Sequence, residues 1–329
     1  MTRAYHNPSV PLSSRASLGV GSRLVLAIAL LSSATWAQAE PFGYTAMGDQ
    51  GDQLVQIDLA TGELRTIGSF GGIGETPFAD VEGMALDSKG RLFAISDLAE
   101  TLLRVDVSTG LANAVGPLFG LGLRGQGAGQ FNQLDVGLAF TCDGRLWMSS
   151  DAVNKLWEID LLTGVALPVG ETGKKISGLA GYDNDLYGIG VDEDEGLYRV
   201  DRETGVATLI GRTGLSASFH DAGLDFDADG KLWATLDYNI PPSGRPEDYR
   251  VSEIVQLDPD TGQVISVRPA LGAVTIELES LAIAPAACVE GVPPEDPEPI
   301  IVDTLQPRSL GLLALLLGLI GLTGLRRRN

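Results

Sequence analysis

The stretch LVQIDLATG, residues 54–62, is the first of five copies of one pattern. The copies share the form Leu/Ile-x-x-apolar-Asp-x-x-Thr-Gly, and the other four occupy residues 102–110, 156–164, 197–205 and 254–262. A second pattern, a Gly-Leu-Ala-like run followed by a turn and a Leu-aromatic pair, alternates with the first at residues 83–93, 137–147, 178–187 and 223–233. Successive copies lie 41 to 57 residues apart, so the body of the chain consists of repeated units.

Each repeated unit predicts four short strands. The first is the Gly-Leu-Ala-like run, whose small residues suit a crowded central channel. The second contains the Leu-aromatic pair and follows turns such as Asp143-Gly144. The third alternates apolar and polar residues, and the fourth follows the Asp-x-x-Thr-Gly turn. We assign the repeated Asp and Gly residues to turn chemistry rather than to function, because Asp bonds its own backbone there and Gly takes the left-handed conformation.

This repeat length and strand pattern predict an all-β, five-bladed β-propeller. Residues 43–68 supply strands two to four of a unit without a first strand, and residues 280–284 supply a first strand with nothing after it. We therefore expect the two ends to pair and to close one blade. A sixth blade would have to come from residues 111–135, whose Gly-rich run indicates a loop.

The composition agrees with a turn-rich β protein and excludes one class of partner. The 329 residues include 42 glycines, and only 6% are aromatic. The formal net charge is −20, and residues 40–289 alone hold 38 acids and 16 bases. Because such a surface repels phosphate backbones, we expect no nucleic-acid partner.

The two ends of the chain predict export. Residues 1–39 combine three arginines, a short apolar run and the Ala37-Gln38-Ala39 site of a secretory signal peptide. Residues 40–288 form the predicted propeller, and residues 289–308 a Pro- and acid-rich linker. Residues 309–329 contain an apolar segment and a basic tail. The sixteen residues 310–325 would reach about 24 Å as a helix, nearly enough to cross a membrane, with the arginines on the cytoplasmic side.

The C-terminal part resembles the PEP-CTERM and IPTL-CTERM sorting signals of Gram-negative bacteria. Pro297-Glu298-Pro299 supplies the tripeptide of the first type, and Val302-Asp303-Thr304-Leu305 is similar to the second, with Asp in place of Pro. The resemblance implies that the tail is removed and the body delivered to the outer surface or the extracellular matrix. The alternative is a plain membrane anchor. Both place the body outside the cytoplasm, in contact with the membrane through the C-terminal helix until it is processed.

Cys142 and Cys288 are the two cysteines of the chain. An even pair in an exported protein suggests a disulfide, and both positions are expected on one face near the propeller axis. The alternative is two free thiols too far apart to meet.

Acidic residues recur where strands open on one face of the predicted propeller. They stand before first strands and after second strands, at Asp80 and Glu82, Asp97, Asp135, Asp151, Asp221, Asp237, Glu277 and Glu279, with Asp49 and Asp192 at related positions. The loop 192–195 adds further acids. Several carboxylates around a narrow channel need either raised pKa values or a hard cation. We predict a Ca²⁺ site held by Glu82, Asp135, Asp221 and Glu279; the alternative is a solvated acidic rim.

The start of the first full blade, Glu82-Gly83, resembles the metal-binding strand start of regucalcin and gluconolactonase-type propellers. This resemblance implies a divalent cation on Glu82 and, as an alternative function, lactonase activity. Those enzymes have six blades and use an Asn and an Asp as further ligands, whereas Asn154 lies deeper in its loop here.

Two further features concern catalysis and ligand recognition. His220-Asp221 is the one place in the mature chain for a histidine general base, although a lone histidine before a strand is more often structural. The loop 236–253 carries two tyrosines and two arginines, which favour ligand recognition; the alternative is an ordinary insertion.

These features indicate an exported, surface-anchored or secreted propeller that acts as a non-enzymatic binding protein for an extracellular polymer, glycan or protein, with Ca²⁺ as its stabilising ion. The alternative is a Ca²⁺-dependent hydrolase of lactonase or esterase type, in which His220 and Asp221 are the catalytic candidates. We expect the protein in the cell envelope, at the outer surface or in the extracellular matrix of a Gram-negative bacterium.

Overall fold

The computed structural model describes residues 41–48, 52–129, 133–238, 245, 250–271 and 277–288. The predicted signal peptide, linker and C-terminal helix lie outside these ranges. No helix within them is long and apolar enough to cross a membrane.

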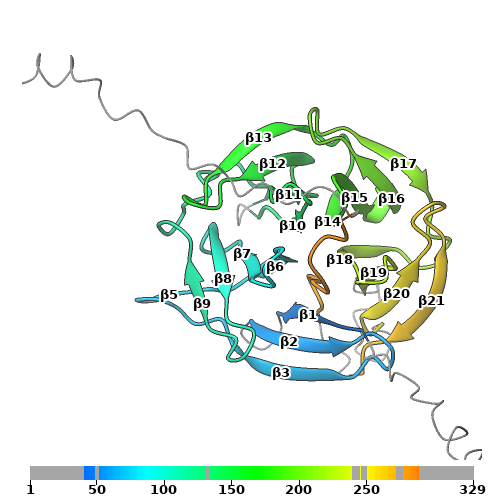
Figure 1. Ribbon diagram of the computed structural model, residues 1–329, viewed down its shortest axis with the longest axis horizontal. Coiled ribbons are helices and arrows are strands. Elements are labelled where there is room, and N and C mark those ends of the chain that lie inside the picture. Colours follow the sequence, from blue (N-terminus) through cyan, green and yellow to red (C-terminus); the bar gives the residue numbers. More distant parts are fainter. Residues whose placement is uncertain are drawn as a thin grey trace, which may run out of the picture. The chain divides into compact units, whose positions relative to one another are not determined.

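Five β-sheets surround a central axis, so the predicted five-bladed propeller is confirmed (Figure 1). Each of four blades is a four-stranded antiparallel sheet whose strands follow the chain from the axis outward. Blade 1 consists of β6 (Val81–Leu86), β7 (Leu92–Ser96), β8 (Thr101–Val105) and β9 (Ala112–Ala114). Blade 2 consists of β10 (Val136–Phe140), β11 (Leu146–Ser150), β12 (Lys155–Ile159) and β13 (Ala166–Glu171). Blade 3 consists of β14 (Ile176–Tyr182), β15 (Asp185–Gly190), β16 (Gly196–Val200) and β17 (Ala207–Gly211). Blade 4 consists of β18 (Phe219–Phe226), β19 (Leu232–Tyr238), β20 (Glu253–Leu257) and β21 (Val264–Pro269).

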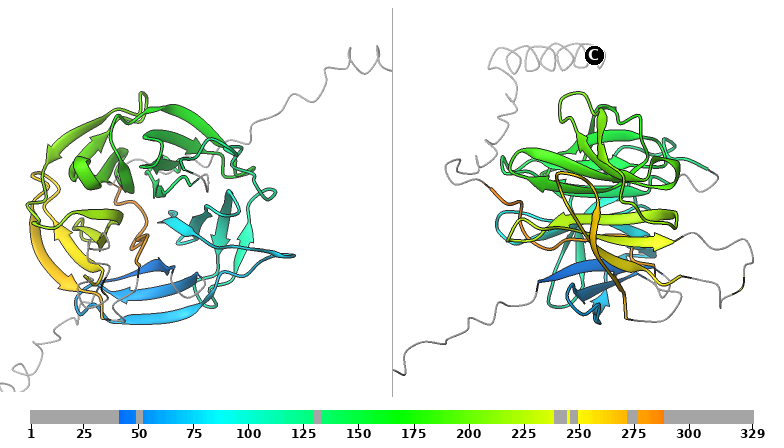
Figure 2. Two further views of the ribbon diagram at one scale, coloured as in Figure 1. Left: turned by 180° about the vertical axis from the view of Figure 1, so that it is seen from behind. Right: turned by 90° about the vertical axis from the view of Figure 1, so that its right-hand side faces the viewer.

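The fifth blade is assembled from both ends of the described chain. Its outer strands are β1 (Phe42–Met47), β2 (Gln53–Asp58) and β3 (Leu64–Ser69). The segment 277–283 lies antiparallel beside β1 through bridges of Tyr44 with Ala282 and of Met47 with Leu278. Tyr44 and Ala282 exchange two backbone hydrogen bonds of 2.7 and 2.9 Å. The predicted closure is therefore confirmed, and we call this sheet the closing blade; its innermost segment crosses the middle of the ring in Figures 1 and 2.

The repeated Asp-x-x-Thr-Gly segments are turns, as predicted. In the first copy, the Asp58 carboxylate accepts the backbone N–H groups of Ala60 and Thr61 at 2.8 and 2.9 Å. Gly62 closes the turn with φ +81°, which a side chain would strain. The same bonds recur at Asp160 and Asp258, so these acids are occupied by backbone groups.

The hydrophobic core is divided into five clusters, one at each interface between neighbouring blades. Between blades 1 and 2, for example, Phe93 packs edge-to-face on Phe140 with ring centroids 5.4 Å apart. Because each sheet is apolar on both faces, a blade cannot be stable without its neighbours, and closure of the ring buries the last two faces.

Glycines of the first strands bring the blades together at the axis. A Cβ on Gly83, Gly137, Gly178 or Gly223 would overlap backbone of the next first strand or, for Gly223, backbone of Ser280 and Leu281. The small residues of the repeat are therefore required by close approach around the axis, as the sequence predicted.

Two features were not predicted. A short hairpin, β4 (Gly72–Ile73) and β5 (Thr76–Pro77), precedes blade 1, and the one described helix is the 3₁₀ turn η1 (Asp192–Asp194). The Gly-rich run after β9 forms no strand in its described part, residues 115–129, so no sixth blade is present there.

Candidate functional site

The acidic residues gather at one face because of the strand register. In blade 1, Val81 at the start of β6 pairs with Ser96 at the end of β7, so Glu82 and Asp97 lie at the same edge of the sheet. In blade 2, Val136 pairs with Ser150, which brings Asp135 and Asp151 to the same edge. We call this end of the central axis the acidic mouth.

Blades 1 and 2 place their acids in the same way. The backbone N–H of Asp97 donates to the carbonyl of Asp80 at 2.7 Å, and that of Asp151 donates to the carbonyl of Asp135 at 3.2 Å. Asp80 and Asp135 both have positive φ, 56° and 44°. Each of these two blades therefore holds one aspartate before its first strand against another after its second strand.

The tightest group at the acidic mouth consists of Asp80, Glu82 and Asp97. One carboxylate oxygen from each lies within 4.8 Å of the others. Glu82 and Asp97 are buried, and Asp80 is half-buried. We call this group the blade 1 triad.

Several of these acids accept backbone N–H groups from the next blade. The carboxylate of Asp52, in the closing blade, accepts the N–H of Asp80. In blade 1, Asp97 accepts the N–H of Leu134 at 2.8 Å, and Glu82 accepts that of Val136. The acids of the mouth thus have a structural role between blades, which uses one oxygen of each carboxylate.

Three carboxylates at the acidic mouth have a buried oxygen that makes no hydrogen bond within the described part of the chain. Among the described residues, the buried oxygens Asp97 Oδ1, Asp151 Oδ1 and Glu279 Oε2 have no hydrogen-bond partner. A buried carboxylate oxygen without a partner costs free energy unless a proton or a cation satisfies it. The mouth therefore has unused binding capacity for a positive charge.

Burial and mutual repulsion raise the pKa values of these carboxyl groups. Burial is the largest cause for Asp97, whose pKa rises to about 7. It also raises the pKa of Asp151 to about 8 and that of Glu279 to about 10, with the Asp221 charge adding to both. The pKa of Glu82 is raised well above its usual value by burial and by the charges of Asp135 and Asp97. Without a cation, several of these groups hold protons at neutral pH.

The four residues predicted to bind Ca²⁺ all lie around the mouth, but only Glu82 belongs to the triad. A hydrogen bond from the Glu82 side chain offsets part of the rise that burial causes in the pKa of Asp135. Asp221 accepts the hydroxyl of Ser177, in blade 3, at 2.5 Å. Glu279 reaches the mouth from the closing blade, where its carboxylate lies against Gly48.

Blade 3 departs from the predicted pattern. The backbone N–H of Val191 donates to the carbonyl of Lys175 at 3.1 Å, so Val191 rather than Asp192 is the equivalent of Asp97, and a lysine stands where blades 1 and 2 have an aspartate. Lys175 pairs with Asp192 and Glu193 at 3.3 and 3.1 Å, and Lys174 pairs with Asp194 at 2.7 Å. The loop 192–195 is therefore largely neutralised. Asp49 lies outside the described residues.

His220 lies at the rim rather than within the triad. Its side chain is 41% exposed, and Nε2 is 3.5 Å from Asp237 Oδ2. Asp237 is buried and accepts the hydroxyl of Ser252 at 2.9 Å. Of the two alternative catalytic candidates, His220 therefore contacts Asp237, and Asp221 contacts Ser177.

Two of the four recognition candidates in the loop 236–253, Tyr238 and Arg250, make contacts within the chain. Tyr238 is buried in β19, and its hydroxyl donates to Glu253 at 2.6 Å. Arg250 stacks over the Tyr238 ring at 4.1 Å and pairs with Glu253 at 2.9 Å. These two residues therefore have intramolecular roles. Arg245 is exposed, and Tyr249 lies outside the described residues.

A pocket of about 570 Å³ opens directly beside the triad. Asp80, Asp97 and Glu100 line it, together with Phe119 and Arg124, whose guanidinium lies 4.6 Å from the Phe119 ring centroid. The volume is in the range of small-molecule sites. Sequence reasoning missed this pocket because the loop after β9 follows no repeat pattern.

The arrangement fits a hard divalent cation. Ca²⁺ binds oxygen ligands at 2.3 to 2.6 Å, so two of its ligands are at most about 5 Å apart, in agreement with the spacing of the triad. Zinc does not suit a group of carboxylates from which both cysteines and His220 are absent.

No protein-family model and no curated protein matches this sequence. Solved structures with a similar arrangement include virginiamycin B lyase from Staphylococcus aureus, at 14% identity and a TM-score of 0.38, over 70% of this chain and 71% of that one. A gluconolactonase from Xanthomonas campestris has 16% identity and a TM-score of 0.40, over 70% and 77%. Regucalcin from Agrobacterium tumefaciens, a calcium-binding protein, has 18% identity and a TM-score of 0.41, over 74% and 78%. These likenesses concern the general arrangement of strands, and the site is argued from the residues of this chain.

Proposed function

We propose that this chain is an exported propeller that binds Ca²⁺ through Asp80, Glu82 and Asp97 and uses the ion to hold an extracellular ligand at the acidic mouth. The observation that carries the proposal is the buried Oδ1 atom of Asp97, which has no partner among the described residues although it belongs to the group of converging carboxylates. A cation there would satisfy this oxygen and displace the protons that burial holds on the group.

The pocket beside the triad supports a ligand-binding role. Because Asp80 and Asp97 line it, an ion on the triad would face the pocket and have coordination positions left for ligand oxygens. Arg124 and Phe119, which also line this pocket, offer one positive charge and one apolar surface. Hydroxyl or carboxylate oxygens of a glycan, another polymer or a protein loop suit this combination.

The test is a thermal melt of the chain with excess Ca²⁺ and with EDTA, together with elemental analysis of the purified protein. At a Ca²⁺ concentration 100 times the dissociation constant, binding adds about 2.7 kcal/mol of stability, or a shift of about 5 to 10 °C for a domain of this size. Glu82→Gln should remove the shift, whereas Glu203→Gln, at an exposed turn of blade 3, should keep it. Equal melting temperatures in Ca²⁺ and EDTA, with no bound metal, would rule out the ion.

A metal-dependent hydrolase is the second candidate, and the pKa values at the mouth favour it. Burial raises the pKa of Asp221, which is not one of the three proposed Ca²⁺ ligands, to about 7, and this allows Asp221 to give or take a proton near neutrality. Turnover on a panel of esters and lactones, lost in Glu82→Gln and in Asp221→Asn with the fold intact, would establish this activity. A chain that binds Ca²⁺ without turnover on the panel would retain only the binding role.

A further inference from the structure

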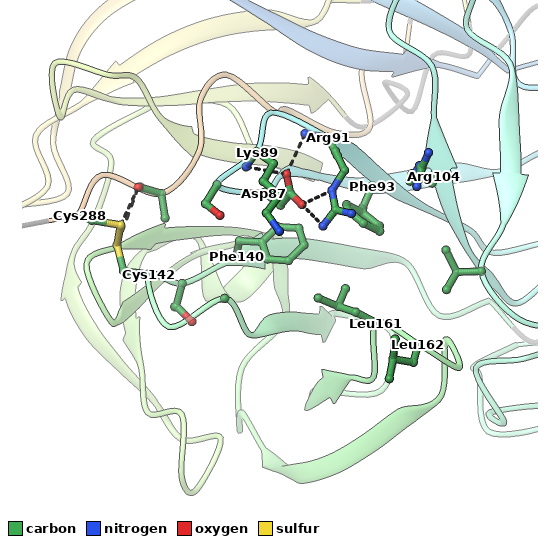
Figure 3. A pocket seen from close by; sticks show the side chains of 15 residues that line it. Asp87, Lys89, Arg91, Phe93, Arg104, Phe140, Cys142, Leu161, Leu162 and Cys288 are labelled. Carbon is green, nitrogen blue, oxygen red and sulfur yellow. Dashed lines mark hydrogen bonds and ion pairs between the residues drawn. A yellow bond between two sulfur atoms is a disulfide. The ribbon is translucent and has the colours of Figure 1, made fainter. Parts of the chain in front are cut away.

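A second pocket, of about 480 Å³, lies at the opposite end of the strands from the acidic mouth. Figure 3 shows this pocket from close by, with the side chains that line it. Its lining comes from the turn 87–91 between β6 and β7 and from the turn 141–144 between β10 and β11. The mouth acids lie at the other ends of these strands, so the two pockets open on opposite faces of the ring. We call this one the basal pocket.

The floor of the basal pocket is apolar. Phe93 and Phe140, each at most 5% exposed, meet there at the interface of blades 1 and 2. Leu161 and Leu162 form one side, and the Leu162 side chain is 75% exposed. This volume and lining are those of a site that takes a compact apolar body.

The rim of the basal pocket is cationic. Its lining holds Lys89, Arg91 and Arg104 against a single carboxylate, that of Asp87. Arg91 pairs with this carboxylate at 2.5 Å, and Asp87 also accepts the backbone N–H groups of Lys89 and Arg91 at 2.9 and 2.8 Å. The carboxylate of Asp87, the one acid of the lining, therefore already binds the backbone of its own turn and the Arg91 side chain.

Arg104 is an exposed cation beside the apolar floor of the basal pocket. It pairs in register with Phe93 across β8 and β7, so both side chains leave the same face of blade 1. No carboxylate of the described residues pairs with Arg104, and no dashed line reaches it in Figure 3. Its guanidinium thus stands at the edge of the apolar floor with its donors directed to solvent or to a ligand.

The charge of the rest of the chain makes this pocket distinctive. The protein carries 43 acids against 23 bases, yet here cations outnumber acids by three to one. In a strongly negative molecule, such a local excess concentrates anions at one place and repels them elsewhere.

We propose that the basal pocket binds a small amphipathic anion, a single carboxylate on a compact apolar body. The apolar body lies on Phe93 and Phe140, and the carboxylate is bound by Arg104. This site is separate from the acidic mouth and does not depend on the proposed Ca²⁺ function.

The test uses 2-naphthoate as probe, with 2-naphthamide as its neutral analogue and 2-naphthylmethylamine as its cationic analogue. Binding to the full chain is followed by fluorescence titration in EDTA, so that the acidic mouth holds no metal. We expect the order naphthoate, naphthamide, amine in decreasing affinity. Arg104→Gln should weaken naphthoate binding about tenfold, because a hydrogen bond to a charged partner is lost at an exposed rim, and should change naphthamide binding about twofold or less.

Two variants serve as controls. Arg65→Gln removes the same charge from an exposed position on β3 of the closing blade and should leave naphthoate affinity unchanged. Leu162→Ser, at a side chain too exposed to support the core, should weaken naphthoate and naphthamide alike.

Equal affinity for naphthoate and naphthamide would overturn the proposal, since the negative charge of the ligand would then add nothing to binding. Absence of binding to the wild-type chain would do the same. So would loss of affinity in Arg65→Gln equal to that in Arg104→Gln, because the charge effect would then be non-specific. If a peptide of residues 289–299 bound the pocket in place of naphthoate, the pocket would belong to the chain's own acidic segment and the small-anion assignment would be wrong.

Discussion

The carboxylate of Asp97 accepts the backbone N–H of Leu134 at 2.8 Å, a hydrogen bond that joins blade 1 to the residues leading into blade 2. Its other oxygen, Oδ1, is buried and has no partner within the described part of the chain. One carboxylate therefore stabilises the ring through one oxygen and carries unused charge on the other. Asp151 and Glu279 at the acidic mouth also have a buried oxygen without a partner among the described residues, and the consequences for stability are measurable.

The metal-free protein should lose stability as the pH rises from about 4 to about 8. Burial raises the pKa of Asp52 to about 6, that of Asp97 to about 7 and that of Asp151 to about 8. Carboxyl groups whose folded-state pKa is raised bind more protons in the folded chain, so their contribution is complete below pH 4 and is lost as the pH passes the raised values. For Asp97 alone the loss is on the order of 4 kcal/mol.

Melting curves in EDTA at pH 5 and pH 8 check this prediction. The melting temperature should be lower at pH 8 by about 10 °C, and excess Ca²⁺ should remove most of the difference by replacing the lost protons. Carboxyls whose pKa is lowered, such as that of Asp143 beside Thr141 and Arg202, act below about pH 4 and outside this window. A melting temperature that rises between pH 5 and pH 8 in EDTA would contradict the proposed charge crowding.

Asp97→Asn separates the two roles of this side chain. The amide oxygen still accepts the Leu134 N–H, while the charge that repels Asp80 and Asp135 is removed. In EDTA at pH 8 the variant should melt about 2 to 5 °C above the wild type, and its response to Ca²⁺ should shrink. Asp260→Asn, at an exposed turn of blade 4, is the matched control and should change neither value. If Asp97→Asn melted below the wild type in EDTA, the carboxylate would be structural only.

Much of this architecture could be predicted from the sequence because the repeats mark where each strand begins and which strands are equivalent in successive blades. The Asp-x-x-Thr-Gly turns and the Gly-Leu-Ala runs place every strand. The unmatched first strand at 280–284 predicts the closure, and the strand phase brings Glu82, Asp135 and Asp221 to one face. These inferences need only the register of neighbouring strands, which a repeat specifies.

Contacts that depend on non-repeated residues could not be predicted. Blade 3 substitutes Lys175 for the aspartate of blades 1 and 2, and the one-residue shift to Val191 turns the loop 192–195 toward lysines. The pocket at Arg124 is formed by a loop of irregular conformation, with Phe119 at φ +60°. Such positions depend on loop geometry and on side-chain packing between blades, and the repeat period carries no information on either.

The disulfide between Cys142 and Cys288 should contribute about 3 kcal/mol of stability. It joins the turn after β10 to the end of the closing segment across 146 residues, with Cα atoms 5.6 Å apart, and confirms the predicted pairing. Its main effect is to restrict the unfolded chain, and here it also retains the segment that closes the ring.

The double variant Cys142→Ser, Cys288→Ser should therefore have a lower urea midpoint than the oxidised wild type. Adding a reductant should lower the wild-type midpoint to nearly the same value and leave the variant unchanged. Equal midpoints for the variant and the oxidised wild type would show that the bond does not constrain the ring.

Gly137→Ala should be strongly destabilising, because it adds a methyl group where the first strands pack closely around the axis. A Cβ at Gly137 would overlap the carbonyl oxygen of Ser177 in blade 3 and lie 2.9 Å from the backbone nitrogen of Leu179. Because both neighbours are backbone atoms of an inner strand, relief requires blades 2 and 3 to separate, at a cost of about 3 kcal/mol.

Gly90→Ala is the matched comparison. Gly90 has φ +71° but nothing within 4 Å of an added Cβ, so this substitution should lower the free energy of unfolding by about 1 to 2 kcal/mol, the cost of placing a side chain in the left-handed region. Urea denaturation of both variants measures the difference, and a smaller loss for Gly137→Ala than for Gly90→Ala would mean that the first strands do not pack as closely around the axis as this structure requires.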